Sequence, residues 1–562
     1  WPKSMKFGEG EKTQRWVRPL QRLLCVFDGN VVDFDVFGIA ASNTTEGHRR
    51  MGRGPFTVSN FLDYASALEG EGHVLLDRAA RESLILNGAR KVCADAGFEL
   101  VEDAGLLTEV AGLVEWPVPV LGEMDPDFLD LPPEVITLTM KTHQKYFAVR
   151  DPKTGELVSK FVTIANQVAP DGGAAIAAGN ARVLSARLSD ARHFWDNDRK
   201  TPLSDMAAQL SKVTFHEKLG TVAERVERIE NFGAWIADHT GADRDQVSRA
   251  ALLAKADLVS EMVYEFPELQ GTMGGYYATD QGEDPAVSAA VWDHYKPQGP
   301  SDNLPVADVA IAVALADKIE LLSAFWAINE KPTGSKDPFA LRRAALGVIR
   351  ILLESKTRLP LKKLLDDCIH YIFDMTFEPK GEPVSSEVYA ADLLAFFADR
   401  LKVHLRDEGI RHDVIDAVFA LGDDDLVRVT AKARALQAFL DTEDGAALLA
   451  GNKRASNILA KSDDDLTGEP DAAYLAGAPE SAERDLIAAL NTAGPAAEKA
   501  LADEDFAAAM RALSQLRAPI DAFFEQVTVN TDDDALRCNR LLLLSAIRTA
   551  IRAVADFDKI SG

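Results

Sequence analysis

Residues 306–328 read VADVAIAVALADKIELLSAFWAI, the longest apolar stretch of the chain and the one that best indicates its fold. The stretch is long enough to cross a membrane, but it contains Asp308, Asp317, Lys318 and Glu320. Charged side chains are costly inside a bilayer because they lose their hydration, so a membrane span is excluded. Residues 306–328 are instead predicted to form a helix buried in a water-soluble protein.

The chain on both sides of this stretch is also predicted to be helical. From about Pro202 onward, apolar residues recur at three- and four-residue spacing, which predicts helices almost throughout. Proline and glycine in residues 297–305 and 378–383 are predicted to interrupt these helices. Residues 462–481 are rich in Asp, Gly, Pro and Ala, and they are predicted to form an interdomain linker or a long loop.

The first third of the chain alternates strand and helix patterns. Residues 24–27 and 32–36 are predicted to form a β-hairpin around the turn Asp28-Gly29-Asn30. A second hairpin is predicted from Val135 to Val149, with a turn at residues 151–155 and a return through Val158 to Ile164. A chain of 562 residues is expected to be multidomain, here with an α+β N-terminal region followed by mostly α-helical domains.

The composition limits the possible functions. The net charge is −27, whereas nucleic-acid binders are usually basic, so any binding of RNA must rest on local patches. Acidic runs at residues 423–425, 463–465 and 532–534 are predicted to be solvated helix starts or loops. The four cysteines are far apart and form no local cluster with histidine, which indicates a reducing cytoplasm rather than disulfides or zinc.

Short motifs for zinc binding and for phosphate binding are both incomplete. His216-Glu217 begins like the HExxH zinc motif, but Gly220 stands where the second histidine belongs. Residues 332–336, PTGSK, lack the upstream glycine of a phosphate-binding loop. If the protein takes part in an energy-requiring reaction, the reactive site is therefore expected on another chain.

Eight segments spread over the chain stand out together. They are WPKSM (1–5), LVEWPVPVLGEMD (113–125), KTHQKYFAVRD (141–151), GNARVLSARLSDARHFWDND (179–198), FHEKLGT (215–221), KADLVSEMVYEFPELQGTMGGYYA (255–278), PTGSKDPFALRRAALG (332–347) and DALRCNRLLLL (534–544). In this order they resemble the beta subunit of the bacterial two-subunit glycyl-tRNA synthetase. Because chains of that family extend further upstream, Trp1 is interpreted as the start of an N-terminally truncated chain.

The resemblance implies a function in translation. It implies a cytoplasmic heterotetramer of two alpha and two beta subunits that attaches glycine to tRNA(Gly). The alpha subunit is expected to hold the active site, with ATP and Mg, where glycyl-adenylate forms. This chain is expected to carry no cofactor and to bind and position the tRNA.

The resemblance also implies four domains. Residues 1–200 are expected to form an editing-like, tRNA-binding α+β body, and residues 201–365 an HD-like helical domain. Residues 366–460 are expected to be a helical connecting region, and residues 461–562 a DALR-type anticodon-binding domain.

HD-type domains hold a metal ion with histidine and aspartate side chains, and the matching residues here are His216, Asp257, His294 and Asp317. Ala256 replaces the histidine of the central His-Asp pair. Losing one ligand weakens metal affinity, so the cluster is expected to be degenerate, without metal or catalytic residues. A rival hypothesis is an active HD-type metal-dependent phosphohydrolase acting on nucleotides or RNA ends.

Two groups of basic residues before the C-terminal region are candidates for tRNA contact. Lys141, His143 and Lys145 are predicted to share one face of a strand. Arg342 and Arg343 are predicted to begin a helix, where arginine can meet phosphate. A solvated strand face and local salt bridges explain the same residues without RNA.

The C-terminal helix provides the third group. At about 100° per residue, four arginines fall within an arc of about 120° beside an apolar stripe. These residues are Arg537, Arg540, Arg548 and Arg552. The pattern indicates a surface that faces RNA, although pairing with residues 532–534 or capping of carbonyl groups also explains Arg537 and Arg540. A second rival hypothesis is a helical scaffold that binds no RNA.

Overall fold

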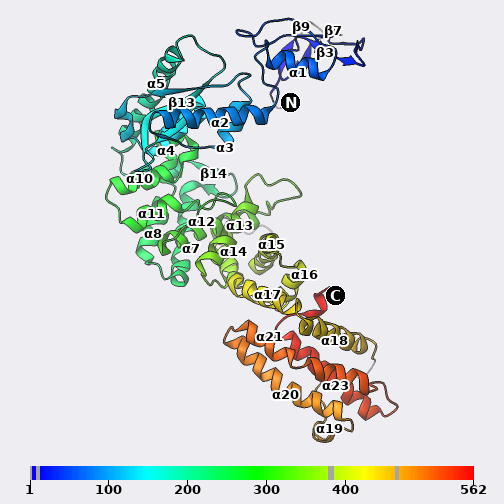
Figure 1. Ribbon diagram of the computed structural model, residues 1–562. Coiled ribbons are helices and arrows are strands. Elements are labelled where there is room, and N and C mark those ends of the chain that lie inside the picture. Colours follow the sequence, from blue (N-terminus) through cyan, green and yellow to red (C-terminus); the bar gives the residue numbers. More distant parts are fainter. Residues whose placement is uncertain (1–2, 8–12, 377–384, 463–467, 562) are drawn as a thin grey trace. The chain divides into compact units, whose positions relative to one another are not determined.

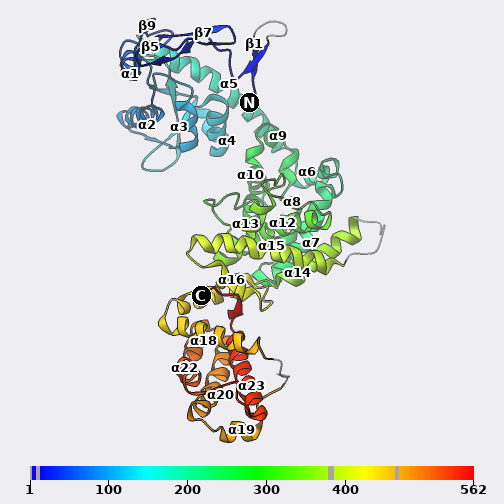
Figure 2. The same cartoon turned by 90° about the vertical axis from the view of Figure 1, so that its right-hand side faces the viewer.

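The computed structural model describes residues 3–7, 13–376, 385–462 and 468–561. The chain divides into two compact units, residues 1–198 and 199–562. Figures 1 and 2 show that strands are concentrated in the first unit and that helices make up nearly all of the second. The predicted fold class, an α+β region followed by mostly helical domains, is confirmed.

The first unit begins with short strands. β4 (Val26–Phe27) and β5 (Asn30–Val31) pair antiparallel around Asp28 and Gly29, which both have positive φ, so a hairpin at the predicted turn is confirmed. The return strand was predicted at residues 32–36 but lies earlier, at residues 30–31, and β6 (Asp35–Val36) pairs with β7 (Ile39–Ser42) instead. The other elements before the main sheet are β1 (Met5–Phe7), β2 (Gln14–Trp16), β3 (Leu23–Leu24), β8 (Thr44–Thr45), β9 (Phe56–Thr57) and α1 (Phe61–Glu69).

A four-stranded antiparallel sheet forms the core of this unit. Its strands, in spatial order, are β10 (Glu99–Leu100), β12 (Phe147–Arg150), β13 (Leu157–Ala165) and β11 (Val118–Glu123). Helices α2 (Arg78–Asp95) and α3 (Ala104–Ala111) contribute side chains to the same core. Ile85, Ala89 and Cys93 recur every four residues on α2 and therefore form one buried stripe.

The second predicted hairpin is right in its turn and return strand but wrong in its first half. β12 and β13 pair antiparallel as expected. Residues before β12, however, form α4 (Pro133–Leu138) and a π-helical turn, Thr139–Gln144. Pro133 is suited to the first turn of a helix, and Val135, Ile136 and Met140 bury the helical face. The strand predicted to begin at Val135 therefore begins only at Phe147.

The second unit is helical from its start, as predicted, and among its described residues β14 (Thr214–His216) and β15 (Gly220–Thr221) are its two named strands. The first part contains α6 (Leu203–Gln209), α7 (Val222–Thr240), α8 (Arg244–Leu253), α9 (Glu261–Glu265), α10 (Thr272–Asp280), α11 (Pro285–Asp293), α12 (Asp308–Ala327), α13 (Leu341–Ser355) and α14 (Leu361–Thr376). The remainder contains α15 (Ser386–Asp407), α16 (His412–Phe419), α17 (Leu426–Leu440), α18 (Glu443–Leu459), α19 (Ala472–Gly477), α20 (Ser481–Ala502), α21 (Phe506–Ser514), α22 (Arg517–Gln526) and α23 (Asp534–Arg552). Helix α5 (Ala174–Asp198) ends the first unit.

Helix α12 is the buried helix predicted from residues 306–328. It contacts α7, α8, α11, α13, α14 and α15, and even its charged residues Asp317, Lys318 and Glu320 are buried. Among the described residues, no helix is long and apolar enough to span a membrane. The break predicted at residues 297–305 lies between α11 and α12. The break at 378–383 and the segment 463–467 of the predicted linker lie outside the described residues.

Candidate nucleic-acid interface

The structure separates the four arginines of α23 by their burial. Arg540 is only 5% exposed, because its guanidinium pairs with the buried carboxylate of Glu483 on α20. It also donates a hydrogen bond of 2.8 Å to the carbonyl oxygen of Thr528. Arg537 pairs with Asp534 at 2.8 Å at the start of the helix. Both guanidinium groups are therefore engaged by other groups of the protein, Arg540 by α20 and Arg537 by the first turn of α23.

Arg548 and Arg552 lie further along α23 and are more accessible. The Arg548 guanidinium pairs with Asp558 at 2.7 Å, but a good part of the side chain reaches solvent. The Arg552 side chain is 63% exposed, and its nearest carboxylate, that of Asp556, is 4.0 Å away. An exposed ion pair at this distance contributes little, so Arg552 is available to a ligand.

A cavity of about 670 Å³ opens beside Arg548, between α18 and α23. Its polar lining consists of Lys453, Ser456, Asn457, Ser545, Arg548 and Asp558. Asp558 accepts hydrogen bonds from Asn452 at 3.1 Å and from Ser456 at 2.8 Å, so the α18 side of the cavity is held in place. Cations next to hydroxyl and amide groups form the combination that contacts phosphates and base edges of RNA.

The first of the three acidic runs, residues 423–425, is less solvated than predicted. Asp423 is held by Arg428 at 2.7 Å and by Lys432 at 2.9 Å. Asp425 caps α17, accepting from the backbone N–H of Val427 at 3.0 Å. In the third run, Asp533 caps α23, which agrees with a helix start. Residues 463–465 lie outside the described residues. The Asp423 carboxylate is therefore neutralised by its own neighbours.

The first group of basic candidates does not share a strand face, because Lys141 and His143 lie on the π-helical turn described above. Lys145 follows it with a φ of +59°. The Lys141 ammonium pairs with Asp103 at 2.6 Å, and that of Lys145 pairs with Glu109 at 2.9 Å. Both lysines thus contact carboxylates at α3.

The second group lies at the start of α13, as predicted. Asp337 caps this helix, accepting from the backbone N–H groups of Leu341 and Arg342 at 2.9 Å each. The Arg342 guanidinium donates to the carbonyl oxygen of Gly334 at 2.7 Å. Arg343 is exposed and forms no ion pair with the part of the chain that the structure describes. It is the more accessible of the two.

The HD-like cluster is organised around a lysine. Lys255 is 1% exposed, and its Nζ lies 2.8 Å from Oδ1 of Asp317 and 3.6 Å from the ring centroid of Tyr295. Arg225 of α7 contacts the same carboxylate at 2.9 Å. Burial lowers the pKa of Lys255 to about 7. Burial alone would raise the pKa of Asp317, but Lys255 and Arg225 outweigh it and hold that pKa below its usual range.

Asp257 and His294 are buried close to this lysine. Oδ2 of Asp257 accepts hydrogen bonds from the backbone N–H of Gly271 at 2.6 Å and of Gly274 at 2.9 Å. Burial raises the pKa of Asp257 to about 6. Nδ1 of His294 lies 2.7 Å from the carbonyl oxygen of Val291, and burial lowers the pKa of the ring well below its usual value. The His294 ring is therefore neutral, and its Nδ1–H donates to the Val291 carbonyl oxygen.

His216 takes no part in the centre formed by Lys255 and Asp317. It lies on β14, where its Nε2 is 3.4 Å from Glu330 and its ring contacts Phe325 and Phe339. The four residues expected to form one cluster are therefore divided, with Asp257, His294 and Asp317 in one place and His216 in another.

The residues of this centre do not fit a metal ion. Among the described residues, no three His, Cys, Asp or Glu side chains are arranged to hold one. Lys255 already supplies a cation to Asp317, and the backbone packs closely, since a Cβ at Gly274 would lie 3.2 Å from the Asp257 carboxylate. The centre is a buried network of the protein's own charges.

Comparisons with known proteins identify the family of the chain. The family model described as "Glycyl-tRNA synthetase beta subunit" matches residues 1–420, and the model "DALR anticodon binding domain" matches residues 448–557. The chain belongs to the glycyl-tRNA synthetase beta subunit family. A glycine–tRNA ligase beta subunit of Phenylobacterium zucineum is 55% identical over all of this chain and 81% of its own length. One of Paracoccus denitrificans is 52% identical over all of this chain and 80% of its own length.

The DALR match begins on α18 and extends past the end of α23. Lys453 and Asn457 were not anticipated from the sequence, because only folding brings α18 beside α23. Lys255 was also missed, although a lysine inside the apolar run AALLAKADLV was a usable signal. A charged residue in such a run must find a buried partner.

Proposed function

We propose that this chain binds tRNA(Gly) and positions its acceptor end for an alpha subunit, which joins glycine to the tRNA. ATP and Mg act at the alpha subunit, in a cytoplasmic assembly of two alpha and two beta subunits. The chain itself supplies RNA contacts and no cofactor. Family membership supports the ligase function, and the relatives' names supply the beta-subunit role.

One observation carries the RNA-binding part of this proposal. Within the DALR match, Lys453 of α18 and Arg548 of α23 line a cavity of about 670 Å³, and the exposed Arg552 lies one helical turn beyond Arg548. Cations at this spacing can neutralise successive phosphates, and the hydroxyl and amide groups between them can contact bases. Local basic character thus coexists with the acidic total charge.

The rival hypotheses have less support. A metal-dependent phosphohydrolase needs a metal ion, and Lys255 pairs with the aspartate that would bind it. The hypothesis of a scaffold that binds no RNA does not explain the DALR match or the polar cavity. The proposal therefore assigns binding to the C-terminal helices and chemistry to the partner.

The experiment that tests the proposal combines the purified chain with a glycyl-tRNA synthetase alpha subunit. Neither chain alone should aminoacylate tRNA(Gly) efficiently, and the mixture should do so when glycine and ATP are present. In parallel, the chain alone should bind tRNA(Gly) in a filter-binding assay. A mixture that forms glycyl-adenylate but gains nothing in tRNA charging from this chain contradicts the proposal.

A further inference from the structure

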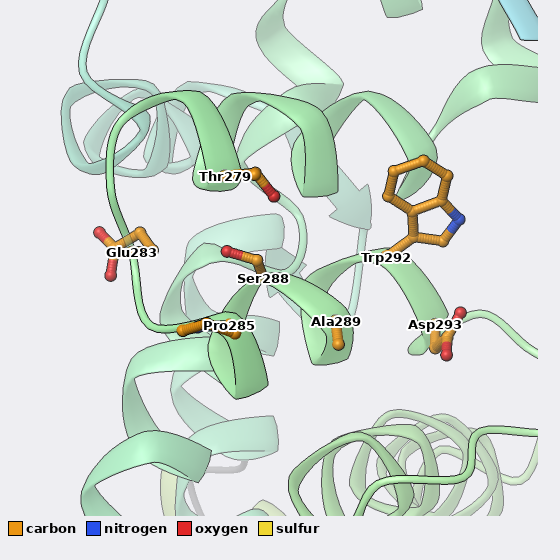
Figure 3. A pocket seen from close by; sticks show the side chains of 7 residues that line it. All are labelled: Thr279, Glu283, Pro285, Ser288, Ala289, Trp292 and Asp293. Atoms are coloured by element: carbon orange, nitrogen blue, oxygen red, sulfur yellow. The ribbon is translucent and has the colours of Figure 1, made fainter. Parts of the chain in front are cut away.

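A second cavity lies far along the sequence from the DALR match, between α10 and α11. It has a volume of about 440 Å³, within the range of sites for small ligands. Figure 3 shows the side chains of Thr279 and Ser288 extending into the space between the two helices, with Glu283 on one side and Trp292 on the other. None of these residues belongs to the basic groups described above.

The acidic residues of this cavity are already neutralised. The Glu283 carboxylate pairs with the guanidinium of Arg249 through two contacts, one of them 3.1 Å. The Asp293 carboxylate lies 2.8 Å from the ammonium of Lys296. A cationic ligand would have to displace these partners, and a phosphate would meet two carboxylates. The lining therefore favours a neutral ligand.

Trp292 gives the cavity a fixed flat wall. The indole packs against Tyr276 with ring centroids 4.5 Å apart. It also rests directly on the α10 backbone, since a Cβ at Gly275 would lie 2.7 Å from Cε3 of Trp292. A ring held in this way needs little further ordering when a second flat ring stacks on it.

The polar groups beside this wall are hydroxyls. Ser288 is 6% exposed, and its hydroxyl has no hydrogen-bond partner in the part of the chain that the structure describes. Thr279 donates its hydroxyl proton to the carbonyl oxygen of Gly275 at 2.9 Å, so its oxygen remains free to accept. A buried hydroxyl without a partner is costly, and a ligand that bonds to it removes that cost.

We propose that this cavity receives one unpaired base of the bound tRNA, which stacks on Trp292 and hydrogen-bonds to Ser288 and Thr279. The inference rests on the proposed tRNA-binding function and adds a base-recognising site to it. Neutral flat rings with donors and acceptors on their edges are the chemistry that the cavity matches, and unpaired RNA bases supply them.

The test measures tRNA(Gly) binding by the full chain as a function of salt concentration. Trp292→Leu should weaken binding about 5- to 150-fold, since loss of one base–aromatic stack costs about 1–3 kcal/mol. The salt dependence should stay unchanged, because stacking neutralises no phosphate. Trp292→Phe should retain most of the affinity, and Ser288→Ala should lose part of it without a change in volume. Tyr264→Leu, which removes an exposed aromatic ring of α9, is the matched control and should bind like the parent chain.

Three outcomes overturn the inference, and thermal unfolding of each variant verifies that it is folded. If Trp292→Leu binds tRNA as tightly as a parent chain that binds normally, the base site is contradicted and the proposed function is not. The same result with weakened association of the alpha subunit assigns the cavity to a protein side chain instead. A parent chain that binds no tRNA overturns the proposed function and the base site together.

Discussion

The ammonium of Lys255 lies 2.8 Å from the carboxylate of Asp317, and both groups are buried in the core of the helical unit. The lysine stands two residues before Asp257, next to the position where an HD-type centre would carry histidine. It supplies from within the chain a positive charge that a metal ion would otherwise provide. Arg225 and Glu320 extend the network, with a distance of 2.8 Å between the guanidinium and the carboxylate.

Replacing Lys255 tests this network. Lys255→Met should lower the free energy of unfolding by about 1.5–3 kcal/mol, because Asp317 loses one of its two buried cations and keeps only Arg225. Urea denaturation of the parent chain and the variant measures the change. In Lys255→Met/Asp317→Leu, both charges are absent and Arg225 keeps Glu320, so part of the stability should return.

The metal content of the parent chain gives an independent check. Elemental analysis should find no stoichiometric transition metal, and His216→Ala should alter no hydrolytic activity. About one zinc, iron or manganese per chain that disappears in Asp257→Ala would restore the phosphohydrolase hypothesis.

Arg540 should behave as a structural residue. Arg540→Gln removes the partner of the fully buried Glu483, so the variant should lose about 3–5 kcal/mol of stability. The salt dependence of tRNA binding should remain that of the parent chain at a temperature where the variant is folded. A variant of normal stability with a shallower salt dependence would show that Arg540 contacts phosphate instead.

The arginine stripe shows how far the sequence could lead. Helical periodicity correctly placed the four arginines on one helix beside an apolar stripe. It could not separate Arg540 from Arg548, because their difference comes from Glu483 on α20 and Asp558 after α23. Such partners are distant in sequence, and only tertiary packing determines them.

Local patterns failed where helix and strand compete for the same residues. The strand was predicted to begin at Val135, yet Pro133 and the burial of Val135, Ile136 and Met140 favour a helix there. The buried α12, in contrast, was predictable, because twenty mostly apolar residues with a few charges fit only a core helix in this chain. The charges themselves required partners that the sequence did not identify.

Asp423 should make stability depend on pH at the acidic end. Burial alone would raise its pKa, but hydrogen bonds from Arg428 and Lys432 outweigh it, and the pKa is lowered. A folded-state pKa below the unfolded value stabilises the protein at higher pH, and this contribution is lost as the pH falls through the folded pKa. Asp423→Asn should therefore cost about 1.5–3 kcal/mol at pH 7.

Urea unfolding at several pH values measures this effect. The difference in stability between the parent chain and Asp423→Asn should shrink progressively as the pH falls below about 5. Asp399→Asn, which removes an exposed carboxylate paired with Lys402, is a suitable control and should show a much smaller difference. A constant difference down to about pH 2 contradicts the assigned direction of the Asp423 pKa shift.

The division of labour between subunits predicts the behaviour of the isolated chain. Without an adenylation site, it should show no glycine-dependent exchange of pyrophosphate into ATP. Addition of an alpha subunit should restore the exchange. Robust exchange by this chain alone, after removal of contaminating alpha subunit, would contradict the assignment of the chemistry to the alpha subunit.

The salt dependence of tRNA(Gly) binding tests most directly whether the C-terminal helices bind the tRNA. The measurement compares the parent chain with Arg548→Gln, Arg552→Gln and Arg244→Gln, the last removing an exposed arginine of α8 paired with Asp238. Removing one cation that neutralises a phosphate should lower the slope of log affinity against log salt by about one unit. We predict that Arg548→Gln and Arg552→Gln each weaken binding and lower the slope, while Arg244→Gln matches the parent chain. Parent affinity and slope in both Arg548→Gln and Arg552→Gln would contradict tRNA binding through this surface.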